Sequence, residues 1–254
     1  MNRWNVLQGV ALCGLMILTG QRGQASVGLA DWCVNLNGDI NTACNGAGGG
    51  GVSPGGGTIS LSSFDTTLEP GTNSLGKIVV TLVPGMSQYV SFYADYDVDY
   101  ASLGSFQDYG TVNGAPPSGV TYELDDPNSS NIFSDFAGNT LMNTNNVGTG
   151  VLPPNVCCDV SWALGIGGIN VPSGGSGTVT FGVSTVQPTS GFYLQQTNID
   201  TGDSIYLSVS ESTSAPCTGP NCVPTVPEPS FAPLLVLAAG GLGMAIAFRK
   251  RVRS

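Results

Sequence analysis

The sequence contains no histidine, and charged residues make up only 9% of its 254 positions. Without histidine, the chain lacks Ser-His-Asp and Cys-His catalytic centres, histidine-bearing zinc sites and imidazole pH switches. Basic residues are also scarce, with seven against 17 acids, and Lys77 is the only one between residues 26 and 230. Polyanion binding needs a basic patch, so we expect no nucleic-acid partner. The acids either keep an exported domain soluble or attract cations.

The first 25 residues have the features of a secretory signal peptide. An apolar run of 13 residues extends from Val6 to Leu18, and the small residues Gly23 and Ala25 precede an expected cleavage site before Ser26. Such a run is too short to span a bilayer. We therefore expect residues 1–25 to be removed and the rest to be exported. An uncleaved N-terminal anchor is the alternative.

Three consecutive segments make up the C-terminus. Residues 212–230 are rich in Pro, Ser and Thr and predict a stalk. Residues 231–248 form an uncharged stretch that is long enough for a single transmembrane helix. The tail 249–254 includes the basic residues Arg249, Lys250 and Arg251, and the positive-inside rule keeps such a cluster in the cytoplasm. We therefore expect the preceding domain to lie outside the cell.

The stalk ends in the residues Val226, Pro227, Glu228 and Pro229. This Pro-Glu-Pro motif, a short apolar helix and a terminal basic cluster, in this order, resemble the bacterial PEP-CTERM sorting signal. The resemblance covers residues 225–254. It implies that a membrane exosortase cleaves near the motif and releases or transfers the protein to the cell surface or an exopolysaccharide matrix. Tails of this type are sometimes named after ice-binding proteins, but the name describes the tail and not an activity. An ordinary membrane anchor is the alternative.

Between these ends, residues 26–211 consist of short β-prone segments separated by Gly- and Pro-rich turns. Val179, Phe181 and Val183 alternate with polar residues, a pattern typical of a strand with one buried face. We therefore predict an all-β domain, an antiparallel β-sandwich of about eight strands in which Phe181 is buried. The expected strands are residues 58–61, 74–83, 88–100, 119–124, 160–166, 177–186, 191–196 and 204–210.

Two local features refine this prediction. The turn at residues 84–87 predicts a hairpin between the strands that flank it. Apolar residues at helical spacing between Ile132 and Leu141 predict one short helix, capped by Ser129 or Ser130. The sequence has no internal repeat, which disfavours a regular parallel β-helix.

Six cysteines remain after removal of the signal peptide. An even number in an exported chain favours disulfides over a metal site. The spacing favours two local bridges, one from Cys33 to Cys44 and one from Cys217 to Cys222. The adjacent residues Cys157 and Cys158 either bond each other in a strained ring or reach distant partners.

The clearest acidic cluster consists of Asp95, Asp97 and Asp99. Alternate residues of a strand share one face, so these carboxylates are candidates for a calcium site. Solvated carboxylates opposite a buried face are the other interpretation. An EF-hand loop is excluded, because Tyr100 and Phe106 stand where its glycine and glutamate belong.

A second cluster consists of Glu123, Asp125 and Asp126, directly before a turn. One interpretation is a glycosidase-type pair, whose two carboxyl groups must lie at a fixed distance from each other. The other interpretation is that these side chains cap the turn. Several aromatic residues either stack on sugars or fill the core. These are Trp32, Trp162, Tyr89, Tyr93, Tyr96 and Tyr100.

These observations leave two principal functional hypotheses. The first is a non-catalytic β-sandwich that is sorted by its tail, needs no cofactor and has a structural or adhesive role, with an exosortase, the bacterial membrane and extracellular polysaccharide as partners. The second is an extracellular carboxylate-dependent hydrolase, glycosidase-like and stabilised by calcium. Ice binding is disfavoured, because it needs regular threonine arrays and the threonines are scattered along the sequence.

Overall fold

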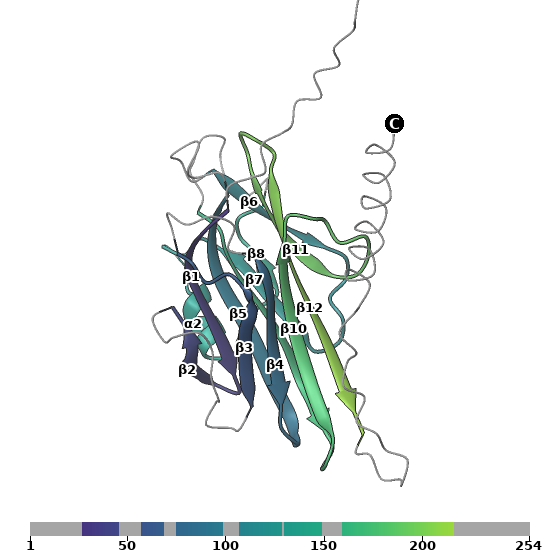
Figure 1. Ribbon diagram of the computed structural model, residues 1–254. Coiled ribbons are helices and arrows are strands. Elements are labelled where there is room, and N and C mark those ends of the chain that lie inside the picture. Colours follow the sequence, from purple (N-terminus) through teal and green to yellow (C-terminus); the bar gives the residue numbers. More distant parts are fainter. Residues whose placement is uncertain are drawn as a thin grey trace, which may run out of the picture.

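The computed structural model describes residues 27–45, 57–68, 75–98, 107–128, 130–148 and 159–215. These residues form two six-stranded sheets and one short helix (Figure 1). Sheet A has the strand order β2-β1-β5-β9-β7-β8, and sheet B has the order β3-β4-β10-β12-β11-β6. The predicted all-β sandwich is confirmed.

Sheet A consists of β1 (Val27–Leu36), β2 (Asp39–Cys44), β5 (Gly85–Val98), β7 (Val120–Asp125), β8 (Thr144–Asn145) and β9 (Ser161–Val171). Sheet B consists of β3 (Thr58–Phe64), β4 (Gly76–Leu82), β6 (Asp108–Asn113), β10 (Ser176–Ser184), β11 (Tyr193–Asn198) and β12 (Ser204–Ser214). Neighbouring strands are antiparallel except β7 and β8, which are parallel. The prediction of about eight strands was too low, because it missed β1, β2, β6 and β8.

The predicted hairpin over residues 84–87 is wrong. The strand before this turn, β4, pairs with β3 and β10 in sheet B, whereas the strand after it, β5, pairs with β1 and β9 in sheet A. The turn therefore carries the chain from one sheet to the other. Residues 90–94 of β5 are buried on both faces, and only a central strand with cover on both sides accommodates such a segment.

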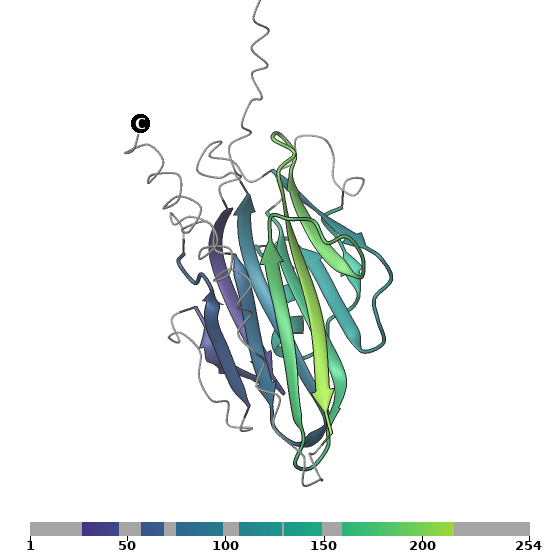
Figure 2. The same ribbon diagram turned by 45° about the vertical axis from the view of Figure 1, so that its right-hand side comes forward.

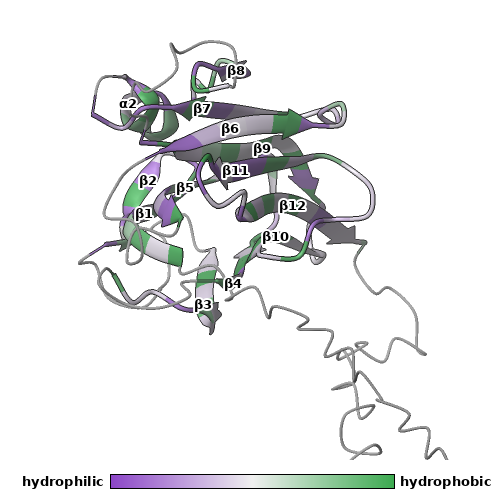
Figure 3. Cartoon of the chain, turned by 90° about the horizontal axis from the view of Figure 1, so that it is seen from above, coloured by the Kyte–Doolittle hydropathy of each residue, from purple (hydrophilic) through white to green (hydrophobic). Residues whose placement is uncertain are grey.

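The core lies between the two sheets, and the two layers are visible in Figures 1 and 3. Phe92 of sheet A lies between two phenylalanines of sheet B, with ring centroids 5.7 Å from Phe64 and 5.9 Å from Phe181. The burial of Phe181 is confirmed, since its side chain is 0% exposed. Burial of apolar side chains from both layers is the main source of stability for such a sandwich.

The outer face of sheet A is covered in part by the helix α2 (Ile132–Ala137). Its buried residues Ile132 and Phe136 pack on Tyr93 and its neighbours in sheet A. Asn131 occupies the N-cap position predicted for Ser129 or Ser130, although the Ser130 hydroxyl accepts a bond of 3.3 Å from the Ile132 amide. The predicted short helix is confirmed in type and place.

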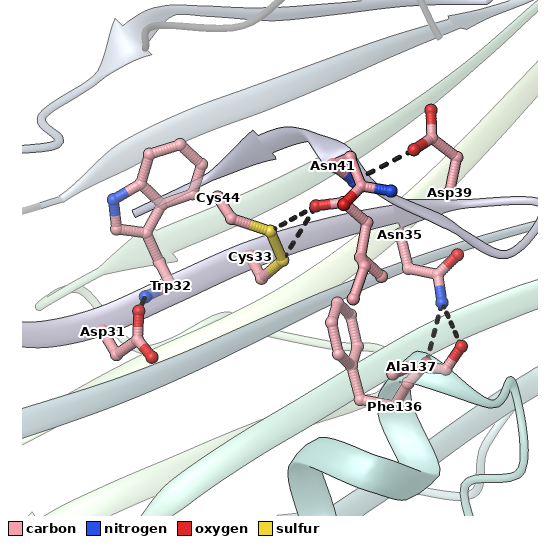
Figure 4. The surroundings of a disulfide bond; sticks show 10 residues. Asp31, Trp32, Cys33, Asn35, Asp39, Asn41, Cys44, Phe136 and Ala137 are labelled. Atoms are coloured by element: carbon pink, nitrogen blue, oxygen red, sulfur yellow. Dashed lines mark hydrogen bonds between the residues drawn. A yellow bond between two sulfur atoms is a disulfide. The ribbon is translucent and has the colours of Figure 1, made fainter. Parts of the chain in front are cut away.

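The predicted Cys33–Cys44 disulfide is present and joins β1 to β2 (Figure 4). The two cysteines are directly paired in the register of these strands, with Cα atoms 4.0 Å apart. In the same region, the Asn35 amide donates to the Phe136 carbonyl at 2.8 Å, at the C-terminal end of α2. These contacts attach both the edge strand β2 and the helix to the centre of sheet A.

Several predictions concern residues outside those that the structure describes. They are the signal peptide 1–25, most of the stalk, the apolar stretch 231–248, the tail 249–254, and Cys157, Cys158, Cys217 and Cys222. Within the described residues, no helix has the length and apolar character needed to cross a membrane.

Candidate functional site

Four neighbouring strands of sheet B carry uncharged polar side chains on their outer face, and Lys77 of the adjoining strand β4 borders them, paired with Gly182 in the register. In β6, β10, β11 and β12, alternate residues fill the core, so the residues between them point outward. We call these outward residues the hydroxyl face. It contains every second residue of the ranges 109–113, 178–184, 193–197 and 204–212. They are Ser, Thr, Tyr, Asn and Gln with one Gly, and none of them is acidic or basic.

The strand register brings together residues that lie far apart in the sequence. Thr111, Gln195, Tyr206 and Ser184 form one row across the four strands. In Figure 2 two of these strands, β10 and β12, lie in front, coloured green to yellow. The scattered hydroxyl residues of the sequence are thus gathered on one surface. They are mixed with tyrosines and amides, so they do not form uniform threonine rows.

The polar groups of this face are held in place by hydrogen bonds to one another. The Gln195 amide nitrogen donates to the Thr197 hydroxyl at 2.9 Å and to the Ser204 hydroxyl at 3.2 Å. The hydroxyls of Thr197 and Ser204 lie 2.8 Å apart, and the Asn113 amide donates to the Gln195 oxygen at 3.4 Å. Groups that are ordered before a ligand arrives lose less entropy when it binds.

Two tyrosines lie at the centre of the hydroxyl face. The rings of Tyr193 and Tyr206 pack edge to face, with centroids 5.8 Å apart. Tyr193 is almost fully buried, whereas Tyr206 is partly exposed. Tyr206 therefore combines an accessible aromatic surface with a polar hydroxyl.

An open cavity of about 550 Å³ adjoins this face, at the connection between β10 and β11. It is lined by Asn113, Gly114, Gln187 and Tyr193 together with residues 188–191. The Gln187 amide nitrogen donates to the Tyr193 hydroxyl at 2.8 Å, which links the loop to the sheet. The volume falls within the usual range for small-ligand sites.

Four of the six aromatic residues singled out from the sequence are buried in the protein, and Tyr100 lies outside the described residues. Trp32, Trp162, Tyr93 and Tyr96 are buried, and Tyr96 packs on Trp162 with ring centroids 5.6 Å apart. Tyr89 is half-buried on sheet A, and its hydroxyl bonds that of Thr121. The sequence reasoning missed Tyr193 and Tyr206, because only the strand register shows that they share a face.

Carboxylates gather on the outer face of sheet A. The register places Asp31, Asp95, Ser161 and Asp125 in one row across β1, β5, β9 and β7. Asp159, just before β9, is hydrogen-bonded to Asp95, and burial, with the nearby Asp126, raises the pKa of Asp159 above its usual value. The hydroxyl face and this acidic face thus differ sharply in charge.

The two described members of the predicted calcium site lie on this face. Asp95 is half-buried and Asp97 is only 5% exposed. The interpretation of these residues as solvated carboxylates is therefore wrong for Asp97. Asp99 lies outside the described residues. Among the residues that the structure describes, no three acidic or cysteine side chains are grouped closely enough to hold a metal ion. A calcium site that includes Asp99 stays a prediction.

The second predicted acidic cluster makes structural hydrogen bonds. Glu123 accepts a bond of 3.4 Å from the Met142 amide, and burial raises its pKa. Asp125 accepts from the Asn146 side chain at 2.7 Å. Asp126 accepts from the Asn128 amide at 2.8 Å, the geometry of an Asx turn. These bonds agree with the interpretation of the cluster as turn caps.

A further carboxyl group lies between the sheets, and the sequence reasoning did not single it out. Asp108 on β6 is 3% exposed, and its Oδ2 accepts bonds from the Gln196 side chain at 2.7 Å and from the Val98 amide at 3.2 Å. Burial raises the pKa of Asp108 to about 6. Its Oδ1 has no hydrogen-bond partner among the described residues.

Comparison with protein-family models, with curated proteins and with solved structures finds no match to this chain.

Proposed function

We propose that the protein is exported, sorted by its C-terminal tail to the cell surface or the exopolysaccharide matrix, and binds polysaccharide there through the hydroxyl face without catalysis. One observation carries the binding proposal: the outward residues of β6, β10, β11 and β12 are uncharged hydrogen-bonding groups around a partly exposed tyrosine. The sorting proposal rests on the motif Val226 to Pro229 and the segments that follow it.

The chemistry of the hydroxyl face suits a sugar polymer. Each sugar hydroxyl both donates and accepts hydrogen bonds, and Ser, Thr, Asn and Gln side chains do the same. A tyrosine adds an apolar ring for the apolar face of a sugar and a polar tip for its hydroxyls. The partly ordered amides, such as Gln195, would meet an extended chain without a large entropic cost.

The lack of side chains that titrate near neutral pH on the hydroxyl face also favours a binding role over a catalytic one. Acid–base catalysis needs a group that titrates near the working pH, and the hydroxyl face has no carboxylate or histidine. The described carboxylates that share a site, such as Asp95 and Asp159, lie on sheet A instead. That pair is the best location for the alternative function, a hydrolase, because one carboxyl group there can hold a proton while its neighbour is ionised.

Replacing Tyr206 with alanine should lower affinity for the bound polysaccharide roughly tenfold, because one aromatic contact contributes about 1.5 kcal/mol. Affinity electrophoresis in gels that contain the polysaccharide measures this change. Tyr206→Phe keeps the ring and should retain most of the affinity. Equal retention of Tyr206→Ala and the unaltered protein would place the binding surface elsewhere.

The sorting proposal predicts the behaviour of a single substitution in the tail. Glu228→Ala should leave the protein in the membrane at its precursor mass, because the exosortase is expected to recognise the Pro-Glu-Pro element rather than the apolar helix. Cell fractionation followed by mass spectrometry compares the variant with the unaltered chain. Ser230→Ala, directly after the motif, is the matched control and should be processed normally. Normal processing of Glu228→Ala would contradict the sorting proposal.

A further inference from the structure

We infer that the cavity beside the hydroxyl face binds one or two units of an uncharged polysaccharide, and that it discriminates against polymers that carry carboxylate or sulfate groups. This inference rests on the proposed polysaccharide binding and specifies its substrate class. The cavity holds about 550 Å³, enough for a ligand larger than a single small molecule such as glycerol.

The lining of the cavity supplies hydrogen bonds but no charge. Asn113, Gln187 and Tyr193 contribute polar groups, and residues 188–191 are Pro, Thr, Ser and Gly. The Gln187 nitrogen donates to the Tyr193 hydroxyl, and the Asn113 nitrogen donates to the Gln195 oxygen. These bonds orient both amides, so the Gln187 and Asn113 side-chain oxygens are set to accept bonds from sugar hydroxyls.

The wall of the cavity depends on two glycines. Gly114 has φ +78°, and a Cβ at this residue would lie 2.7 Å from the carbonyl oxygen of Gly191. Gly191 itself has φ +89°. Larger residues rarely adopt this conformation, so glycine permits the two loops to approach closely. The close contact between the loops fixes the shape of the cavity before a ligand binds.

Electrostatics decides which sugars the cavity accepts. Lys77 on β4 is the only basic residue among those that the structure describes, and it does not line the cavity. A uronate or sulfate group would lose its hydration there without gaining a cationic partner, which is costly. The excess of acids in residues 26–230 would also repel a polyanion as it approaches. An uncharged sugar meets neither penalty.

Gln187→Lys tests this assignment by adding the cation that the cavity lining lacks. The ammonium group can still donate to the Tyr193 hydroxyl, as the Gln187 nitrogen does, so the loop contact is kept while a positive charge enters the cavity. Isothermal titration with cellohexaose and maltohexaose as uncharged probes and hexagalacturonate as the charged probe measures binding. The unaltered protein should bind at least one uncharged probe with an affinity roughly tenfold or more above that for hexagalacturonate, and Gln187→Lys should raise the affinity for hexagalacturonate roughly tenfold at pH 7.

Met86→Lys is the matched control, because it adds the same charge at a residue of β5 that is 77% exposed and does not line the cavity. This variant should bind every probe as the unaltered protein does. If polysaccharide is retained but Gln187→Lys gains no affinity for hexagalacturonate, or the unaltered protein binds hexagalacturonate as well as the uncharged probes, the cavity assignment is overturned and the proposed function stands. If the unaltered protein binds no polysaccharide, both the proposed function and the cavity assignment are contradicted.

Discussion

Replacing Phe181 with alanine is expected to lower the free energy of unfolding by about 3–5 kcal/mol, the cost of removing a buried phenylalanine from a packed core. Phe181 is 0% exposed, and its ring lies 5.9 Å from that of Phe92 across the boundary between the sheets. The substitution therefore removes apolar contacts and leaves a cavity between the two layers. Urea unfolding followed by tryptophan fluorescence measures the loss, since Trp32 and Trp162 are both buried.

Thr180→Ala is the natural control for this experiment. Thr180 precedes Phe181 on β10 but points to the hydroxyl face, where it is partly exposed. Its replacement should change stability by less than about 1 kcal/mol, in line with other substitutions outside a core. Equal effects of the two substitutions would mean that the faces of β10 are assigned the wrong way round.

Asp108→Asn is expected to stabilise the protein at neutral pH. The pKa of Asp108 is raised from 3.8 to about 6 because the group is buried between the sheets, so at pH 7 the folded protein holds a costly ionised carboxylate. The difference between these two values corresponds to roughly 3 kcal/mol. An asparagine oxygen can still accept the bonds from Gln196 and Val98 that Asp108 Oδ2 accepts.

The sign of the pH dependence follows from the raised pKa. The folded state binds the proton of Asp108 more tightly than the unfolded state, so this contribution to stability is fully present below pH 3.8 and is lost as the pH rises through 6. The Asp108→Asn variant has no carboxyl group at this position and therefore lacks this pH-dependent contribution to stability. The stability difference between the variant and the unaltered protein should therefore be small at pH 3.5 and approach its maximum near pH 7.

Thermal or urea unfolding of both proteins between pH 3.5 and 7.5 measures this difference directly. Burial also raises the pKa values of Glu123 and Asp159, which titrate in both proteins, so subtraction leaves the contribution of Asp108 together with its electrostatic interaction with Asp159. A constant difference across this range would show that the Asp108 carboxyl group does not titrate as its burial predicts.

The sequence was sufficient for the parts of the fold that have a strong local signal. Alternation over Val179 to Val183 identified the buried face of β10 correctly, and helical spacing identified α2. Of the strands that were missed, β1 does have an alternating signal in Trp32, Val34 and Leu36, which the prediction overlooked, whereas β6 and β8 lack one. β6 contains Asp, Gly and Asn with few apolar residues, and β8 has only two residues. These segments become strands because a neighbouring strand pairs with them, which is a tertiary effect.

The candidate site was harder to predict for a related reason. Thr111, Gln195 and Tyr206 have no special spacing in the sequence, and the pairing of β6, β11 and β12 alone brings them together. The acidic strand was conspicuous in the sequence, but burial of Asp97 shows that its carboxylates do not simply face water. The hairpin error had the same origin, because a turn sequence does not reveal whether the chain stays in one sheet.

The most direct test of the proposed function is binding and turnover measured on the same sample. The purified protein is applied to immobilised uncharged and charged polysaccharides, and soluble oligosaccharides released over several hours are monitored by chromatography. We predict retention on an uncharged polysaccharide without released products, and loss of retention in Tyr206→Ala. Release of oligosaccharides that stops when Asp95 or Asp159 is replaced, or no retention on any polysaccharide, would contradict a non-catalytic binding role for the hydroxyl face.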